Sequence, residues 1–397
     1  MLAAGFAGQN KSKVLLIEKN HSLGKKLLLT GKGRCNITNA ETDIKEFAAA
    51  FGKKGKFLFS ALNAFGVSDT INFFEQRGLK TKVERGNRVF PASDNAADVL
   101  NVLANFLKQS NVQVLLNSPI KAIVKKGNKI EKIVLKDKEI FADKFILATG
   151  GLSYPGTGSS GEGMSWAKDL GHTVEDIQPA LTPLKIKEKW VGELAGLSLK
   201  NVSICVYQNN KKQDERFGEA LFTHEGISGP IVLDMSKKIG DLLKTGPVFL
   251  RIDFKPALDF LTLDKRVQRD FKEMHNAMFK NSLDKLLPKK LIPVIVRLSK
   301  IDPCKKANRI TSQERNVLLH LLKEMPMEVE GLLGFDKAIV TSGGISLSEI
   351  DPRTMQSKII PNLYFAGEMI DLDGPTGGYN LQACWSTGYL AGASSVA

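Results

Sequence analysis

Cysteine is scarce in this chain, because 397 residues contain only Cys35, Cys205, Cys304 and Cys384, and no two form a CxxC pair. This wide spacing excludes a disulfide framework and a CxxC zinc site, so we expect reduced thiols, no bound metal and a cytoplasmic protein. No uninterrupted apolar run reaches 18 residues, which excludes a membrane-spanning helix. The first residues also lack the basic start, apolar stretch and cleavage site of a secretory signal.

The composition is otherwise that of an ordinary globular protein. Hydrophobic residues make up 43% and charged residues 25%, which excludes a largely disordered chain. The length allows two to three domains of about 150 residues each. Lys and Arg number 56 against 42 Asp and Glu, a net charge of +14. That excess is compatible with nucleic acid, an anionic membrane surface or a phosphorylated ligand as partner.

Glycine, charge and periodicity divide the chain into three stretches. In residues 1–184, short apolar runs alternate with helical patterns, which indicates a parallel α/β sheet. The middle differs, because 185–255 is rich in strand patterns, whereas 256–335 is helical and carries 14 basic against 5 acidic residues over 265–315. Residues 336–397 are again rich in glycine, like residues 1–184. We therefore predict one discontinuous α/β domain with a β-rich and helical insertion.

Individual runs show the pattern clearly. Val14–Glu18, Val112–Leu116 and Lys144–Thr149 are short, apolar and followed by turn residues, so we predict strands there. Asn95–Lys108 has helical periodicity and follows Ser93-Asp94, which are good N-cap residues.

Four motifs are candidates for binding a nucleotide. Glu18 ends a buried strand, as the ribose-binding carboxylate does in dinucleotide folds, although most strands that end in Glu have no such role. The loop 24–39 combines spaced glycines with Lys and Arg, which suits phosphate or a merely solvated basic loop. The strand and small-residue loop 145–163 allow close approach of a ligand. A glycine turn at 374–378 opens a helix whose N–H groups suit a developing negative charge.

Together these motifs resemble one family of flavoproteins. The matching strings are GKKLLLTGKGRCNITN, RVFPASDNAADVL, ATGGLSYPGTGSSGEG, PALTPL, LFTHEGISGP, VTSGGIS and FAGEMIDLDGPTGGYNLQ. They occur in the order found in the HI0933-like FAD-dependent oxidoreductases, also called BaiN-like or aminoacetone oxidase-like. The resemblance implies a Rossmann-like FAD-binding domain with a β-barrel-like and helical domain inserted after PALTPL.

The same resemblance implies which residues meet FAD. Residues at the carboxyl ends of strands and in the glycine turns would surround the cofactor, and the final helix would face the flavin pyrimidine. The implied set is Glu18 and Lys19 at the ribose; Lys26, Gly31, Gly33, Arg34, Cys35, Asn36 and Thr38 at the pyrophosphate and flavin; Ile120 at the adenine; Ala148, Thr149 and Gly150 beside the cofactor; Gly367, Glu368, Asp371 and Gly374 at the ribityl–pyrophosphate part; and Gly378, Tyr379, Asn380 and Leu381 at the pyrimidine.

One departure from the family pattern concerns the start of the chain. Family members begin with a strand and a GGGxAG-type turn, whereas this chain aligns from within the first helix, at Met1-Leu2-Ala3-Ala4. Spacing in dinucleotide folds predicts that about a dozen residues precede this point in the complete motif. Loss of that strand would weaken FAD binding.

These observations predict a flavin-dependent oxidoreductase that passes hydride from a transient donor, NAD(P)H, through FAD to a small organic substrate. Candidate proton donors are His224, Tyr154 and Tyr379, although each is also compatible with a packing role. The alternatives are a nucleic-acid-binding protein and a flavoprotein remnant without FAD. We disfavour nucleic acid because the basic stretch 265–315 has few aromatic residues, which favours a solvated surface.

Overall fold

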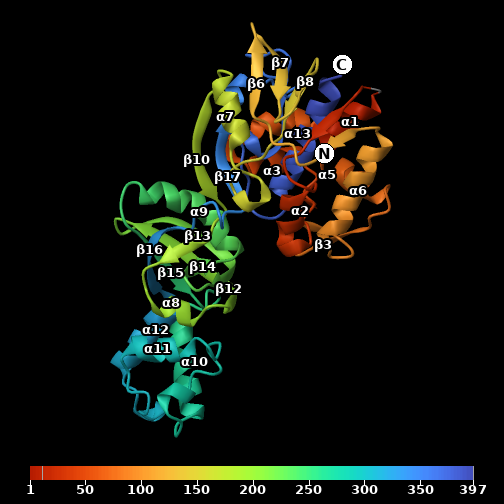
Figure 1. Cartoon of the computed structure of the whole chain (residues 1–397). Helices are drawn as coiled ribbons and strands as arrows, with labels where there is room; N and C mark the ends of the chain where they lie inside the picture. The colour runs from red at the N-terminus through yellow and green to blue at the C-terminus, as the bar shows by residue number, and fades with distance from the viewer. Residues whose placement is uncertain (11, 397) are drawn as a thin grey trace. The chain divides into compact units, whose positions relative to one another are not determined.

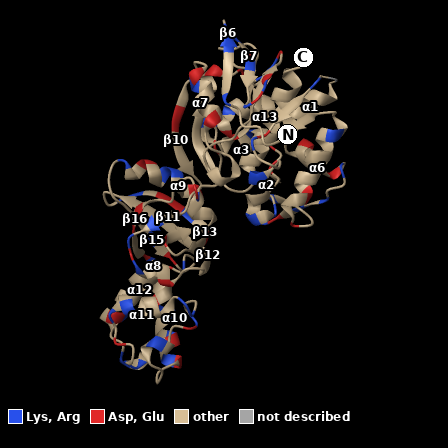
Figure 2. Ribbon diagram, in the orientation of Figure 1, with Lys and Arg blue, Asp and Glu red and all other residues tan. Residues whose placement is uncertain are grey.

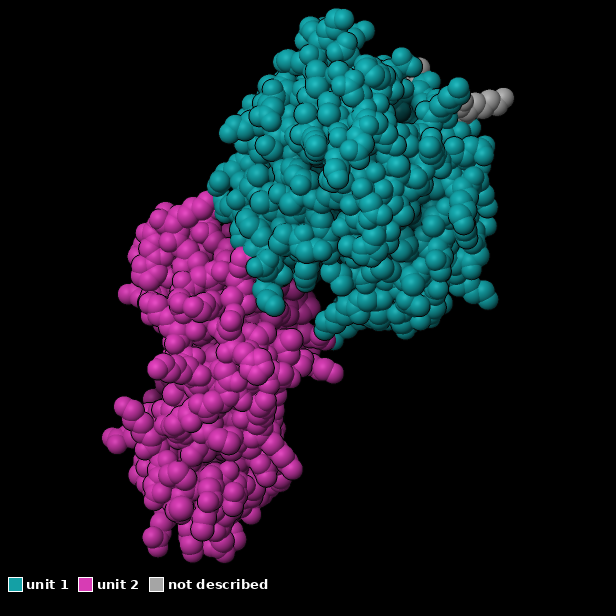
Figure 3. All heavy atoms as spheres, in the orientation of Figure 1, with its two compact units in different colours: residues 1–180, 335–397 teal, residues 181–334 magenta. Residues whose placement is uncertain are grey.

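Two compact units make up the chain in the computed structural model, which describes residues 1–10 and 12–396. Unit 1 comprises Met1–Ala180 and Phe335–Ala397, and unit 2 comprises Leu181–Gly334, as Figure 3 shows by colour. Unit 2 is therefore inserted into a discontinuous unit 1.

Parallel strands form the basis of unit 1 (Figure 1). Strand β1 (Leu15–Ile17) pairs with β5 (Gln113–Leu115), and β9 (Phe145–Leu147) pairs with β18 (Leu363–Phe365). The strands lie where the sequence predicts them and are one or two residues shorter at their ends. Among the described residues the two ladders are separate two-stranded sheets rather than one continuous sheet.

Antiparallel sheets and helices complete unit 1. Three antiparallel sheets are formed by β2 (Thr38–Asn39), β4 (Arg88–Pro91) and β3 (Thr81–Glu84); by β6 (Ala122–Lys126), β7 (Lys129–Val134) and β8 (Glu139–Phe141); and by β10 (Val174–Ala180) with β17 (Val340–Ile345). The α-helices are α1 (Leu2–Gln9), α2 (Lys25–Leu29), α3 (Ile44–Ala49), α4 (Phe59–Ala64), α5 (Val67–Glu75), α6 (Ala96–Gln109), α7 (Glu162–Asp169) and α13 (Tyr379–Ser394).

Local sequence explains where these helices start. Helix α6 begins after Asn95, whose side chain accepts a hydrogen bond from the N–H of Ala97, so the cap lies one residue beyond the predicted Ser93-Asp94. Helix α13 begins after Gly378, whose φ of 103° is a left-handed conformation that glycine adopts without strain. The helix therefore follows directly on the predicted glycine turn 374–378.

A closed six-stranded barrel forms the first part of unit 2. Its strand order is β11 (Leu184–Ile186), β14 (Gly226–Ser228), β13 (Lys211–Phe222), β12 (Ser198–Gln208), β15 (Val248–Asp253) and β16 (Met325–Leu332). Asn209 and Asn210 connect β12 to β13 with positive φ at both positions, as a type I′ hairpin turn requires. Alternate residues of β12 and β15 are buried, so one face of each strand packs inside the barrel.

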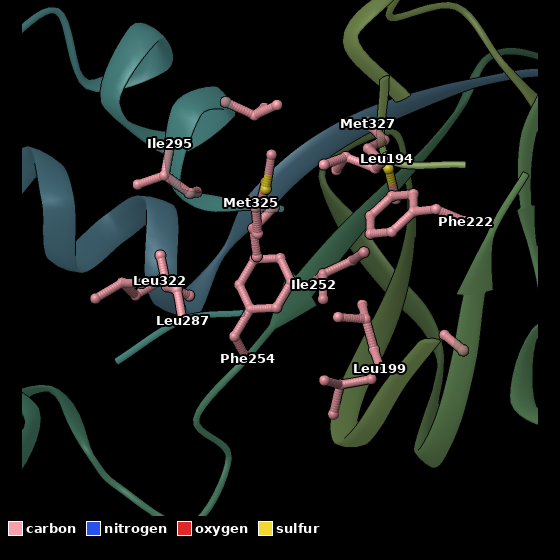
Figure 4. Packing of buried hydrophobic residues seen from close by; sticks show 14 of the residues in the cluster. Leu194, Leu199, Phe222, Ile252, Phe254, Leu287, Ile295, Leu322, Met325 and Met327 are labelled. Carbon is pink, nitrogen blue, oxygen red and sulfur yellow. The ribbon is translucent and has the colours of Figure 1, made fainter. Parts of the chain in front are cut away.

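Helices α10 (Phe260–Glu273), α11 (Ile292–Ser299) and α12 (Ser312–Lys323) form the helical part of unit 2, and α8 (Trp190–Glu193) and α9 (Pro230–Leu243) flank the barrel. One hydrophobic core includes residues of both parts. Leu287, Ile295 and Leu322 of the helical part lie beside Ile252 and Met325 of the barrel (Figure 4). The predicted α/β fold with a β-barrel-like and helical insertion is thus confirmed. No helix within the described ranges is both long and apolar enough to cross a bilayer.

Candidate functional site

The carboxyl ends of three parallel strands of unit 1 carry predicted site residues. Glu18 follows β1, Ala148–Gly150 follow β9, and Gly367 follows β18. Ligands of open α/β sheets bind at this edge, because the loops there can approach a ligand without crossing the sheet. Ala148 and Thr149 are exposed, so their backbone is accessible.

Asn20 connects the end of β1 to the glycine loop after β9. Its backbone N–H and its side-chain amide both donate to Glu18 Oε1 at 2.8 Å. The same amide donates to the carbonyl of Thr157 at 2.9 Å, and Lys25 donates to its oxygen at 3.1 Å. Lys19 adds bonds to Ser160 and Glu162 of the loop. The Glu18 carboxylate is therefore held in one orientation.

The carboxylate of Glu368 accepts hydrogen bonds from three other segments of unit 1. Glu368 lies in the 3₁₀ turn after β18, and Lys26 Nζ donates to its Oε2 at 2.5 Å. Ser153 Oγ and the backbone N–H of Thr341 both donate to its Oε1, at 2.8 and 2.9 Å. Lys26 also donates to Ser153 Oγ at 2.7 Å. Three segments distant in sequence therefore converge on one carboxylate.

The loop between α2 and β2 has an unusual backbone. Gly31, Lys32, Gly33 and Cys35 all have φ between 59° and 83°. Two of these residues are not glycine, and left-handed conformations of such residues cost roughly 1–3 kcal/mol each and occur often at functional sites. The surrounding contacts must therefore stabilise this loop.

Two predicted cofactor residues of this loop have other partners. Arg34 forms ion pairs with Glu84 and Asp94 at 2.9 and 3.2 Å, and its guanidinium lies over the ring of Phe90. These contacts hold the loop against the β3–β4 hairpin. Cys35 is fully buried, and burial raises the pKa of its thiol to about 12. It is therefore a neutral packing residue at physiological pH.

The end of the same loop is bonded to the start of α13. With its amide oxygen facing the helix, Asn36 accepts a hydrogen bond from the N–H of Gly378 at 2.9 Å. Thr38 Oγ1 donates to Gln382 at 2.6 Å, and the side chain of Asn39 donates to the carbonyl of Gly377 at 3.1 Å. Two motifs about 340 residues apart in sequence thus form one structural element, as their joint resemblance to the family implies.

Asn380 and Tyr379 stabilise the glycine turn before α13. The Asn380 side chain accepts from the N–H of Gly374 at 2.8 Å and donates to its carbonyl at 2.9 Å. The ring of Tyr379 packs against Phe47, with ring centroids 4.8 Å apart. A Cβ atom on Gly374 would lie only 2.7 Å from the ring of Phe51, so this position requires glycine.

Asp371 is buried and paired with one lysine. Both of its carboxylate oxygens accept from Lys54 Nζ at 2.6 Å. Burial nevertheless raises the pKa of Asp371 above its usual value. The pair joins the 3₁₀ segment Gly52–Leu58 to the loop after β18.

The remaining predicted residues form none of the hydrogen bonds described above. His224 is exposed and belongs to unit 2, whereas the contacts above are all within unit 1. Ile120 is half-buried in the segment before β6 and packs on the core of unit 1. Tyr154 follows the ATGG strand end in the left-handed conformation, with φ 53°. Leu381 packs on a second core beside α13.

Sequence reasoning missed four residues that hold the site together: Asn20, Lys54, Ser153 and Thr341. Ser153 and Thr341 lie inside strings that already resembled the family, so that resemblance was the available signal. Asn20 and Lys54 stand in ordinary polar segments, and nothing in their local sequence marks them.

The donor set of this region suits FAD. Helix α13 begins at a glycine with no side-chain cap and no acidic residue in its first turn, so the positive end of its dipole suits an electron-rich ring edge or a phosphate. Glu18 offers a carboxylate to ribose hydroxyls, and Lys26 and the glycine loops offer cationic and backbone donors to phosphate. Residues Glu18, Lys26, Glu368 and the start of α13 would hold the cofactor.

Comparisons with known proteins show the family to which the chain belongs. The model of the HI0933-like protein Rossmann domain matches residues 1–394. The chain is 33% identical to the 3-dehydro-bile acid delta(4,6)-reductase of Clostridium scindens, covering 99% of this chain and 95% of the relative. It is 30% identical to the ribosomal RNA dihydrouridine synthase of Escherichia coli, covering 100% and 95%.

A solved structure shows the same fold. The 3-ketosteroid-delta4-(5alpha)-dehydrogenase of Rhodococcus jostii RHA1 superposes with a TM-score of 0.53 at 13% identity, covering 100% of this chain and 94% of that protein. The family match over nearly the whole length carries more weight than this distant likeness. The chain therefore belongs to the HI0933-like family and is an FAD-dependent oxidoreductase.

Proposed function

We propose that the protein uses FAD to saturate a carbon–carbon double bond that is conjugated to a carbonyl group. The reactions named for two relatives share this chemistry. Reduction at positions 4 and 6 of a 3-dehydro bile acid acts on double bonds conjugated to the 3-carbonyl. Formation of dihydrouridine saturates the uracil double bond that is conjugated to the 4-carbonyl.

The observation that carries the proposal is the convergence of Lys26, Ser153 and Thr341 on Glu368, together with the bonds between residues 36–39 and the start of α13. When bound, FAD supplies the two-electron chemistry of the reaction. The protein orients the cofactor with the fixed carboxylates of Glu18 and Glu368. The uncapped start of α13 stabilises negative charge at the ring edge that it faces.

Reduction of a conjugated double bond also needs a proton at the carbon next to the carbonyl. We assign this proton to the phenol of Tyr154. Its φ of 53° is unfavourable for an aromatic residue, and such strain accumulates where a side chain must point in a functional direction. Tyr379 is instead packed against Phe47 and Phe51, which favours a structural role. His224, on unit 2, is the alternative donor.

The reducing equivalents are proposed to come from NAD(P)H acting as a transient donor, because the insertion has no second glycine-rich dinucleotide motif. A hydride is transferred to the β-carbon of the substrate and the Tyr154 proton to the α-carbon, so that the double bond gains two hydrogens. The substrate is accordingly an organic molecule with an enone or a uracil ring.

The test is to purify the protein, quantify its FAD, and follow anaerobic NADPH oxidation with a 4-en-3-one steroid or a uridine-containing RNA as acceptor. Mass spectrometry of the product is expected to show a gain of two hydrogens. Protein that holds FAD but reduces neither acceptor would contradict the proposal. Protein without FAD, even after reconstitution with excess cofactor, would remove its basis.

Tyr154→Phe tests the proton donor. It is expected to slow the oxidation of reduced FAD by the acceptor while leaving the reduction of FAD by NADPH unchanged. Tyr379→Phe is the matched control, because it removes the same hydroxyl from a ring of the same site. Equal effects of the two substitutions would exclude Tyr154 as the donor.

A further inference from the structure

The end of the helical part of unit 2 collects positive charge. Residues 272–281 and 300–309, here called the basic tip, contain six Lys or Arg residues and two acidic ones, and the chain around them is mixed in sign (Figure 2). Three backbone contacts join the two segments. The backbone N–H of Phe279 donates to the carbonyl of Lys305 at 2.8 Å, and that of Ala307 donates to the carbonyl of Ala277 at 2.9 Å. Met278 also forms an antiparallel β-bridge with Lys306. The tip is therefore one compact surface.

The cations of the helical part differ in whether they have a carboxylate partner. Ion pairs are formed outside the tip by Arg266, Arg269, Lys285, Arg297, Arg315 and Lys323, and within it by Lys305. Outside the tip, Lys265, Lys289 and Lys290 are exposed and have no such partner among the described residues. Five exposed cations of the tip have no such partner within the described ranges of the chain: Lys272, Lys280, Lys300, Lys306 and Arg309.

The acidic residues of the tip do not offset this excess. Glu273 pairs with Lys285 at 2.8 Å, so its charge is already compensated. Asp302 accepts the backbone N–H of Cys304 at 2.9 Å, as a turn-stabilising carboxylate does. Five unpaired cations on about twenty residues produce a strong local positive potential, which attracts polyanions from a distance.

We infer that the basic tip binds the phosphate backbone of a uridine-bearing RNA. This inference rests on the proposed function, because uracil is one of the conjugated carbonyl systems that the reaction would accept. The sequence alone favours a solvated surface, since the stretch has few aromatic residues. Folded RNA is recognised largely through phosphates and 2′-hydroxyls, however, and such recognition does not need aromatic stacking.

The composition of the tip favours RNA over an anionic membrane. A membrane-binding surface combines cations with a continuous apolar face that enters the lipid. The tip exposes Met278 at 43%, while Phe279 beside it is completely buried. Lys280, Lys306 and Arg309 are instead accompanied by exposed polar residues such as His275 and Asn276.

The experiment measures binding of a fluorescein-labelled RNA hairpin by fluorescence anisotropy between about 50 and 200 mM salt. The variant is K280A/K306A/R309A in the full-length protein. The matched control is K129A/K136A/K138A, which removes the same charge from exposed lysines of unit 1. Loss of three phosphate contacts is expected to lower the slope of log K against log salt by about 2–3 and the affinity by roughly 10–100-fold.

The outcomes separate this inference from the proposed function. Equal RNA affinity and equal salt slopes for the two triple variants would overturn the RNA surface. So would binding of the wild-type protein to anionic vesicles but not to the hairpin. The tip variant is expected to keep its FAD and its reduction of a 4-en-3-one steroid, which carries no phosphate. If the wild-type protein binds the hairpin but does not reduce the steroid, that result would count against the proposed function and not against the RNA surface.

Discussion

Gly378 is the position where one added methyl group would most directly test how the site is assembled. A Cβ atom there would lie 2.3 Å from both the carbonyl carbon and the oxygen of Thr38, whereas ordinary contacts begin near 3.4 Å. Both neighbours are backbone atoms, so relief requires the 36–39 segment and α13 to separate by about 1 Å. The hydrogen bond from Gly378 to Asn36 would be lost or weakened in the process.

The destabilisation expected from Gly378→Ala has a conformational part and an overpacking part, and the same substitution at a second glycine measures the first part alone. Gly378 has φ 103° and Gly171 has φ 102°, but a Cβ atom on Gly171 would meet nothing within 4 Å. Gly171→Ala is therefore destabilised only by the unfavourable conformation, by about 1–2 kcal/mol. Gly378→Ala is destabilised by the same conformational effect and by a further 1–3 kcal/mol or so from overpacking. We expect its free energy of unfolding to be about 2–5 kcal/mol below that of the wild-type protein.

Urea unfolding and the ratio of flavin to protein absorbance measure the two consequences. Gly171→Ala is expected to keep its FAD, because Gly171 is exposed and lies outside the site contacts. Gly378→Ala is expected to lose most of its FAD even where it remains folded. Our interpretation of the contact between the two motifs would be refuted if Gly378→Ala matched Gly171→Ala in both stability and FAD content.

Three further predictions concern single buried or exposed side chains. Thr341→Val removes the hydroxyl that accepts from the buried N–H groups of Leu152 and Ser153, so we expect a loss of about 1–3 kcal/mol in urea unfolding, which Thr341→Ser largely restores. Burial lowers the pKa of His172 below its usual 6.5, so the unfolded chain binds a proton at this residue more readily than the folded chain does. The free energy of unfolding is therefore expected to be constant above pH 6.5 and to decrease as the pH falls below it. His172→Gln is expected to flatten this part of the plot of stability against pH. Iodoacetamide at pH 8 is expected to alkylate exposed Cys304 but not buried Cys35 in the folded protein. Mass spectrometry of the peptides measures both, and alkylation of Cys35 before Cys304 would contradict this prediction.

Much of the fold was accessible from sequence because the relevant signals are local. Short β-branched runs predicted β1, β5 and β9 within two residues. The glycine turn before α13 was also recognised, since glycine is the residue that the left-handed cap requires. These features depend on neighbours within a few residues, so one sequence suffices to find them.

The partners of the site residues were less accessible, because they depend on distant segments. Arg34 has the composition of a phosphate ligand, yet Glu84 and Asp94 lie within its reach and neutralise it. Ser153 and Thr341 are common polar residues whose importance comes from meeting Glu368 across more than 25 positions in each case. No local pattern distinguishes a hydroxyl that will meet a buried carboxylate from one that will face water.

The place where unit 2 enters the chain has a consequence for how the family diversifies. The last residue of β10, Ala180, pairs directly with Val340, the first residue of β17. The two ends of the inserted region are therefore already neighbours in an antiparallel ladder that belongs to the cofactor-binding unit. A short hairpin loop could replace the whole insertion at that position without moving either strand. The inserted unit can consequently be exchanged or remodelled as one piece while the strands that carry it keep their pairing.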